Sequence, residues 1–165
     1  MADWAGERWA DVRQPGVLAV VRKRLQLCRD KGFLGVEADN VDMVNLDTGL
    51  KNFTAADQLA FIAKVATAAH ELGLAFGLKN DLLQVKDLAP TGLVDFAINE
   101  SCSEYTECKL YRPFQEAGIP VFNVEYSKAA FDRLCGLSGT VKGIRSIFKS
   151  NDLKAVPRAA CPGQP

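Results

Sequence analysis

The sequence alternates between two patterns. A stretch with apolar residues at helical spacing ends at a glycine, a short apolar run follows, and that run ends in polar residues. Gly32 precedes Phe33-Leu34-Gly35-Val36 in this way, and Gly73 precedes Leu74-Ala75-Phe76-Gly77-Leu78. Strands that alternate with helices form parallel βα units, and short apolar strands are typical of a sheet covered on both faces. The pattern therefore predicts an α/β fold with a parallel sheet.

The positions of apolar residues, prolines, glycines and capping residues predict the individual helices and strands. One helix follows Pro15, and a second begins at Thr54, which has the spacing of a capping box with Asp57. His70 is expected at the end of that second helix. The expected strands cover residues 8–13, 33–36, 74–78, 94–98, 119–124 and 143–148. No low-complexity linker divides the chain, so one domain of residues 1–156 is expected, followed by a loose tail of residues 157–165 that is rich in proline and glycine.

Composition excludes several function classes. Lys plus Arg equal Asp plus Glu at 20 each, so no basic excess is present to bind nucleic acid. No apolar stretch approaches the roughly 20 residues that a membrane span needs, and the first residues lack the basic start and apolar run of a signal peptide. No glycine-rich phosphate loop occurs. The cysteines lack the paired spacings of a zinc site, so no metal or cofactor is expected.

Polar side chains follow the expected strands, where parallel α/β folds place their functional groups. Carboxylates and amides bind sugar hydroxyls, and a pair of carboxylates can cleave a glycosidic bond. Any one cluster could be only an Asx turn or a helix start. Together they predict a sugar site. The candidates are Asp11 and Arg13; Glu37, Asp39, Asn40 and Asp42; Lys79 and Asn80; Asn99 and Glu100; and Glu125 and Tyr126.

Two of these features allow more than one interpretation. Cys102 and Cys108 are either two free thiols or a small disulfide loop, and we favour the disulfide, which indicates an oxidising compartment. Cys28, Cys135 and Cys161 are scattered, and their spacing predicts no pairing. Lys79 could form a Schiff base as in a lyase, or an ion pair with the surrounding carboxylates, which we favour.

Five segments resemble, in order, motifs of glycoside-hydrolase family 114: residues 3–13 (DWAGERWADVR), 35–42 (GVEADNVD), 77–80 (GLKN), 99–102 with 107–108 (NESC, EC) and 122–126 (FNVEY). The resemblance implies a TIM-type (β/α)8 barrel and a secreted endo-α-1,4-polygalactosaminidase, and some members carry an α-galactosidase label. It also implies that Asp39 is the nucleophile and Glu100 the acid/base of a retaining mechanism, with a polysaccharide or oligosaccharide as substrate.

Two departures from the family pattern affect these expectations. Ala38 stands where the family usually has proline. Family members also have two further strands before the one expected at residues 8–13, and the first carries acidic residues, whereas this chain supplies only strands three to eight. A complete barrel needs about 250 residues. We therefore expect an open, C-shaped sheet with unpaired edges at residues 8–13 and 143–148, marginal stability, self-association through those edges and little turnover. The rival is a non-catalytic carbohydrate-binding remnant.

Overall fold

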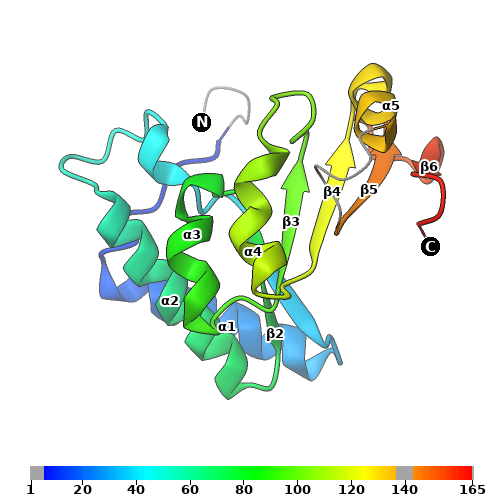
Figure 1. Ribbon diagram of the computed structural model, residues 1–165. Coiled ribbons are helices and arrows are strands. Elements are labelled where there is room, and N and C mark those ends of the chain that lie inside the picture. Colours follow the sequence, from blue (N-terminus) through cyan, green and yellow to red (C-terminus); the bar gives the residue numbers. More distant parts are fainter. Residues whose placement is uncertain (1–5, 137–142, 165) are drawn as a thin grey trace. The chain divides into compact units, whose positions relative to one another are not determined.

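A computed structural model describes residues 6–136 and 143–164 of the chain (Figure 1). The chain forms two compact units, Met1–Phe76 and Gly77–Pro165. Its strands form one six-stranded sheet in the linear order β1-β2-β3-β4-β5-β6. Because β1 and β6 stand at the two ends of this series, the sheet is open, as expected. The α/β class predicted from the alternating pattern is confirmed.

The first unit contains two long helices. Its elements are α1 (Pro15–Asp30), β1 (Gly35–Ala38), the 3-10 turn η1 (Met43–Asn45), α2 (Ala55–Glu71) and the start of β2 (Ala75–Lys79). Helix α2 begins with the predicted capping box: Thr54 Oγ1 accepts from the Asp57 amide at 3.2 Å, and Asp57 Oδ2 accepts from the Thr54 amide at 2.9 Å. His70 lies in the last turn of α2. Apolar side chains of α2, including Ile62, Val65 and Ala66, are buried.

The second unit carries most of the sheet. It contains the end of β2, then β3 (Phe96–Glu100), β4 (Val121–Glu125), β5 (Ile144–Lys149) and β6 (Arg158–Ala160), with helices α3 (Val85–Leu88), α4 (Arg112–Glu116) and α5 (Lys128–Gly136) and the 3-10 turns η2 (Leu82–Gln84), η3 (Ala89–Thr91) and η4 (Cys108–Tyr111). Strands β2 to β5 are parallel, as predicted, and β6 is antiparallel to β5. The carboxyl ends of β2, β3 and β4 therefore meet at one edge of the sheet.

The strand expected at residues 8–13 does not form. These residues are irregular and end in a turn at Val12–Arg13. Arg13 anchors this segment instead, because its guanidinium binds the Asp11 carboxylate and donates to the carbonyls of Lys51 and Asn52 at 3.1 and 3.2 Å. Alternating apolar residues favour an extended chain, but a strand forms only where a neighbouring strand pairs with it.

The expectation of a loose tail and an unpaired β5 edge was wrong. Residues 158–160 form β6, which pairs with residues 147–149 of β5. Gln164 continues this contact, since its side chain accepts from the Ser146 amide and donates to the Ile144 carbonyl, both at 2.8 Å. A disulfide joins Cys161 to Cys135 in α5. The tail is thus held by the backbone groups that the β5 edge would otherwise leave unpaired.

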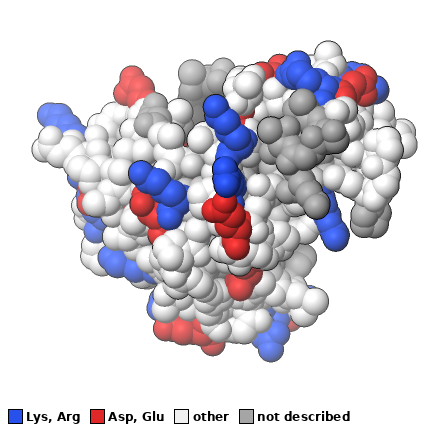
Figure 2. All heavy atoms as spheres, viewed as in Figure 1, with Lys and Arg blue, Asp and Glu red and all other residues white. Residues whose placement is uncertain are grey.

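The surface is mixed in charge. On the face drawn in Figure 2, basic and acidic side chains are interspersed, in keeping with the formal net charge of zero. None of the helices in the described part of the chain could span a lipid bilayer, since each is too short or too polar.

Candidate active site

The second unit gathers charged side chains at the carboxyl ends of β2, β3 and β4. Lys79 ends β2 and Glu100 ends β3, and Lys79 Nζ lies 2.9 Å from Glu100 Oε2. The predicted ion pair is therefore present. The Tyr126 hydroxyl donates to the other oxygen, Glu100 Oε1. The side chain of Glu100 is 38% exposed whereas that of Lys79 is 9% exposed, so the carboxyl group is held from the protein side and stays accessible to a ligand.

The two asparagines of this cluster bind each other. Asn80 Oδ1 accepts from Asn99 Nδ2 at 3.2 Å and from the Glu100 amide at 2.9 Å. Asn80 has a φ of 51°, in the left-handed region, which asparagine tolerates. The Tyr111 hydroxyl donates to the Asn80 carbonyl at 3.1 Å. These contacts fix the backbone around Glu100, and Asn99 is fully buried.

Glu125 ends β4 and is also fully buried, with an exposed fraction of 0%. Glu125 and Asn99 were predicted to bind substrate, but in this structure both side chains are buried and neither reaches the surface. The predicted disulfide between Cys102 and Cys108 is present beside Glu125. One oxygen of Glu125 and both sulfur atoms lie within 4.8 Å of one another. Because the sulfur atoms are bonded to each other, they are not thiolate ligands for a metal ion.

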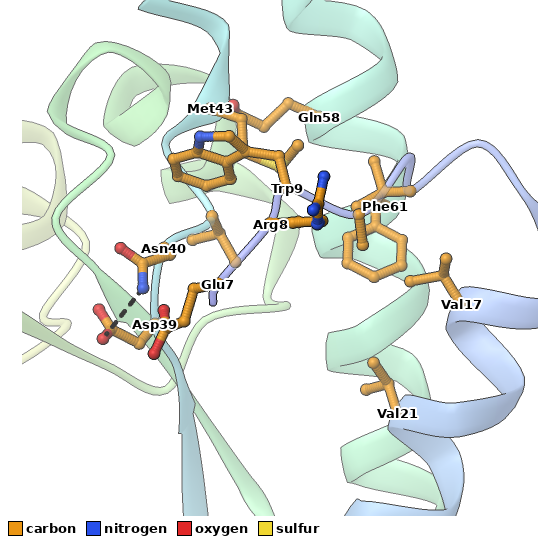
Figure 3. A pocket seen from close by; sticks show the side chains of 13 residues that line it. Glu7, Arg8, Trp9, Val17, Val21, Asp39, Asn40, Met43, Gln58 and Phe61 are labelled. Carbon is orange, nitrogen blue, oxygen red and sulfur yellow. Dashed lines mark hydrogen bonds between the residues drawn. The ribbon is translucent and has the colours of Figure 1, made fainter. Parts of the chain in front are cut away.

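In the first unit, Asp39 and Asn40 follow β1 and line a pocket of about 260 Å³ (Figure 3). Asn40 Nδ2 donates to Asp39 Oδ2 at 3.5 Å. Trp9 lies on the wall of the same pocket, near Met43, and Glu7 lies on the side of Asp39. The Asp39 carboxyl group is exposed. The pocket thus combines an accessible acid with an indole ring, groups that suit a sugar's hydroxyls and its apolar face.

The remaining candidates in the first unit have structural contacts. Arg13 forms a two-pronged ion pair with Asp11, at 2.8 Å from Nε to Oδ1 and 3.0 Å from Nη2 to Oδ2. The hydrogen bond from Arg13 lowers the pKa of Asp11 from 3.8 to about 2. Glu37 is exposed on β1, and Asp42 is half-buried directly before η1.

Comparison with known proteins identifies the family. A model of glycoside-hydrolase family GH114 matches residues 1–163. This chain belongs to family GH114. Among solved structures it is similar to Aspergillus fumigatus Ega3 in complex with galactosamine, with 30% sequence identity and a TM-score of 0.87. That match covers 98% of this chain and 67% of the Ega3 chain. No curated protein matches the chain. The open α/β sheet and this partial coverage fit an incomplete (β/α)8 barrel.

Within this GH114 chain, the structure brings Lys79, Glu100 and Tyr126 into direct contact. Asp39 belongs to the first unit and Glu100 to the second, so the pairing of their carboxyl groups stays a prediction. The sequence did not predict a role for Asn123, which accepts from the Cys102 amide just after Glu100, or for Tyr111, which donates to the Asn80 carbonyl just after Lys79. Asn123 lies within the FNVEY motif, whose alternation in β4 gave the available signal: Asn123 and Glu125 point to the same side of a strand.

Proposed function

We propose that this chain carries the two carboxylates of a glycoside hydrolase that acts on α-linked galactosamine polymers, with Asp39 as nucleophile and Glu100 as acid/base. The observation that carries the proposal is the contact of Glu100 with both Lys79 and Tyr126 in a member of family GH114. The similar Ega3 structure, which holds galactosamine, supports this choice of sugar. An α-galactosidase activity is the related alternative within the same reaction class.

In this mechanism Glu100 gives a proton to the glycosidic oxygen while Asp39 attacks the anomeric carbon. Glu100 then takes a proton from the water that releases the sugar from Asp39. Lys79 and Tyr126 contribute by stabilising the Glu100 carboxylate that forms when its proton passes to the glycosidic oxygen and that persists until water returns one. A retaining enzyme of this kind holds its two carboxyl groups about 5–5.5 Å apart. Asn40, Asp42 and Glu37 near Asp39 would contribute polar contacts to the sugar.

The ion pair disfavours the lyase alternative. A Schiff base forms by attack of an uncharged amine on a carbonyl. Lys79 Nζ lies 2.9 Å from a carboxylate oxygen of Glu100, an arrangement that favours the charged ammonium. A secreted location is part of the proposal as well, and the two disulfides, Cys102–Cys108 and Cys135–Cys161, support it because such bonds persist in oxidising compartments.

The test is hydrolysis of an α-1,4-linked galactosamine polymer, measured by the appearance of reducing ends. We expect weak hydrolysis that Glu100→Gln and Asp39→Asn each abolish. Glu104→Gln is the matched control, because it removes an exposed carboxylate from the same loop and leaves the rate unchanged. Binding of the oligosaccharide without cleavage would favour the carbohydrate-binding alternative. Absence of both binding and cleavage would overturn the proposed substrate.

A further inference from the structure

The three backbone amides that follow Glu100 all donate to strand β4. The Ser101 amide donates to the Val124 carbonyl at 2.7 Å, the Cys102 amide to Asn123 Oδ1 at 3.4 Å, and the Ser103 amide to Glu125 Oε1 at 2.8 Å. Two of the three acceptors are side chains. The path of the chain immediately after Glu100 therefore depends on Asn123 and Glu125.

The backbone needs this support because it turns sharply after β3. Ser101 has a φ of 64°, in the left-handed region that costs energy for a residue other than glycine. Helix α5 holds the far side of the turn: Ser103 Oγ donates to the Ala130 carbonyl at 2.9 Å, and Arg133 donates to the Ser103 carbonyl at 2.6 Å. The turn is thus fixed between β4 and α5, and Glu100 stands at its start.

A single atom of Glu125, Oε1, binds both the turn and the side chain of Asn123. Its Oε1 accepts from the Ser103 amide and also from Asn123 Nδ2 at 2.9 Å, so it aligns the asparagine whose own oxygen accepts from Cys102. Its second oxygen, Oε2, has no hydrogen-bond partner among the residues that the structure describes. Within residues 6–136 and 143–164, the Glu125 carboxylate therefore accepts hydrogen bonds through Oε1 alone.

We propose that Glu125 is a positioning residue for Glu100, acting through Ser103 and Asn123. This inference rests on the proposed role of Glu100 in catalysis. A buried acceptor that aligns the turn keeps the Glu100 carboxyl group oriented toward Lys79 and Tyr126, and small displacements of a catalytic group reduce the rate strongly. Glu125 contributes by the location of its oxygen atom and contacts no substrate.

Two substitutions separate the location of the oxygen from the charge. Glu125→Gln removes the charge and keeps an oxygen at the place of Oε1. It puts the amide nitrogen at the place of Oε2, which has no hydrogen-bond partner in the described part of the chain. Glu125→Asp keeps the charge but withdraws the oxygen by one methylene. We expect Glu125→Gln to stay within about threefold of the original kcat, and Glu125→Asp to lower kcat by tenfold or more while KM changes less than twofold.

A second measurement needs no substrate, so it separates failure of this inference from failure of the proposed function. Hydrogen exchange of the Ser103 amide and the ¹³C shift of the Glu100 carboxyl group are read by NMR in the folded protein. Glu125→Asp should speed that exchange by tenfold or more and move the Glu100 signal, and Glu125→Gln should do neither.

If Glu125→Asp does not fold, Asn123→Ala removes the Cys102 acceptor and should likewise move the Glu100 signal. The reverse order of the two Glu125 variants, or equal behaviour of both, would overturn the inference.

Discussion

Asp11 and Arg13 form a two-pronged ion pair in the first unit, and its effect on the pKa of Asp11 can be measured at the Asp11 carboxyl carbon. The hydrogen bond from Arg13 lowers the pKa of Asp11 from 3.8 to about 2. Stabilisation by the pair is therefore complete above pH 3.8 and is lost as the pH falls through 2. We predict a titration midpoint near 2 for the Asp11 carboxyl carbon by NMR, moving toward 3.8 in Arg13→Gln. A midpoint that stays unchanged in this variant would contradict the assignment.

Glu107 shows the opposite shift within the disulfide loop. Burial, and then the charge of Glu125, raise its pKa above 4.5. The folded protein thus binds this proton more tightly than the unfolded chain, so the ionised carboxylate destabilises the fold as the pH rises above 4.5. We predict that Glu107→Gln raises the free energy of unfolding at pH 7 but not at pH 4, measured by urea unfolding. Glu104→Gln, an exposed neighbour, should show no such difference.

At the residue scale, the sequence could predict chemistry but not exposure. Lys79 and Glu100 were recognised because charged groups at the ends of successive parallel strands come together. Glu125 has the same kind of position in the sequence, yet it is fully buried. Burial depends on the loop of residues 101–108 that covers Glu125, and the position of this loop follows from contacts with β4 and α5 rather than from local sequence.

Pairing of β2 with β3 requires a glycine. Gly77 lies opposite Phe96 in the parallel register, and a Cβ atom at Gly77 would overlap the Phe96 ring. We predict that Gly77→Ala lowers the free energy of unfolding by roughly 1–3 kcal/mol, because the ring must move. Gly16→Ala, in α1 where a Cβ meets nothing within 4 Å, is the control and should be neutral or slightly stabilising.

A double variant tests the cause of this loss. If the ring is responsible, Phe96→Leu should relieve most of the cost of Gly77→Ala, and the two changes should be clearly non-additive in chemical unfolding. Additive losses would point to the backbone of β2 instead. The packing at Gly77 bears on the candidate active site because Lys79 follows Gly77 by two residues on the same face of β2.

Both disulfides lie in the second unit, Gly77–Pro165, and they close loops of different length. Cys135–Cys161 has a sequence separation of 26, and Cys102–Cys108 has one of 6. Loop entropy gives about 3.5 kcal/mol for the longer loop and about 2 kcal/mol for the shorter. We predict that Cys135→Ser with Cys161→Ser costs more stability than Cys102→Ser with Cys108→Ser, measured by urea unfolding.

Thiol titration of the denatured, unreduced chain gives an independent check on both bonds. Cys28 is the free cysteine of the five. One reactive thiol is therefore expected without reductant and five after reduction. Three thiols before reduction would show that one of the two disulfides is absent in solution.

The sequence alone determined the α/β class, the parallel strands, the α2 capping box and the placement of charged groups at strand ends. These follow from local rules: the period of apolar residues, the conformational limits of glycine and proline, and the spacing of capping side chains. Only the tertiary structure decided that residues 8–13 form no strand, that Cys135 pairs with Cys161, and that Glu125 is buried. Each of these depends on a partner distant in the sequence, and no local pattern specifies which distant segment will pair with it.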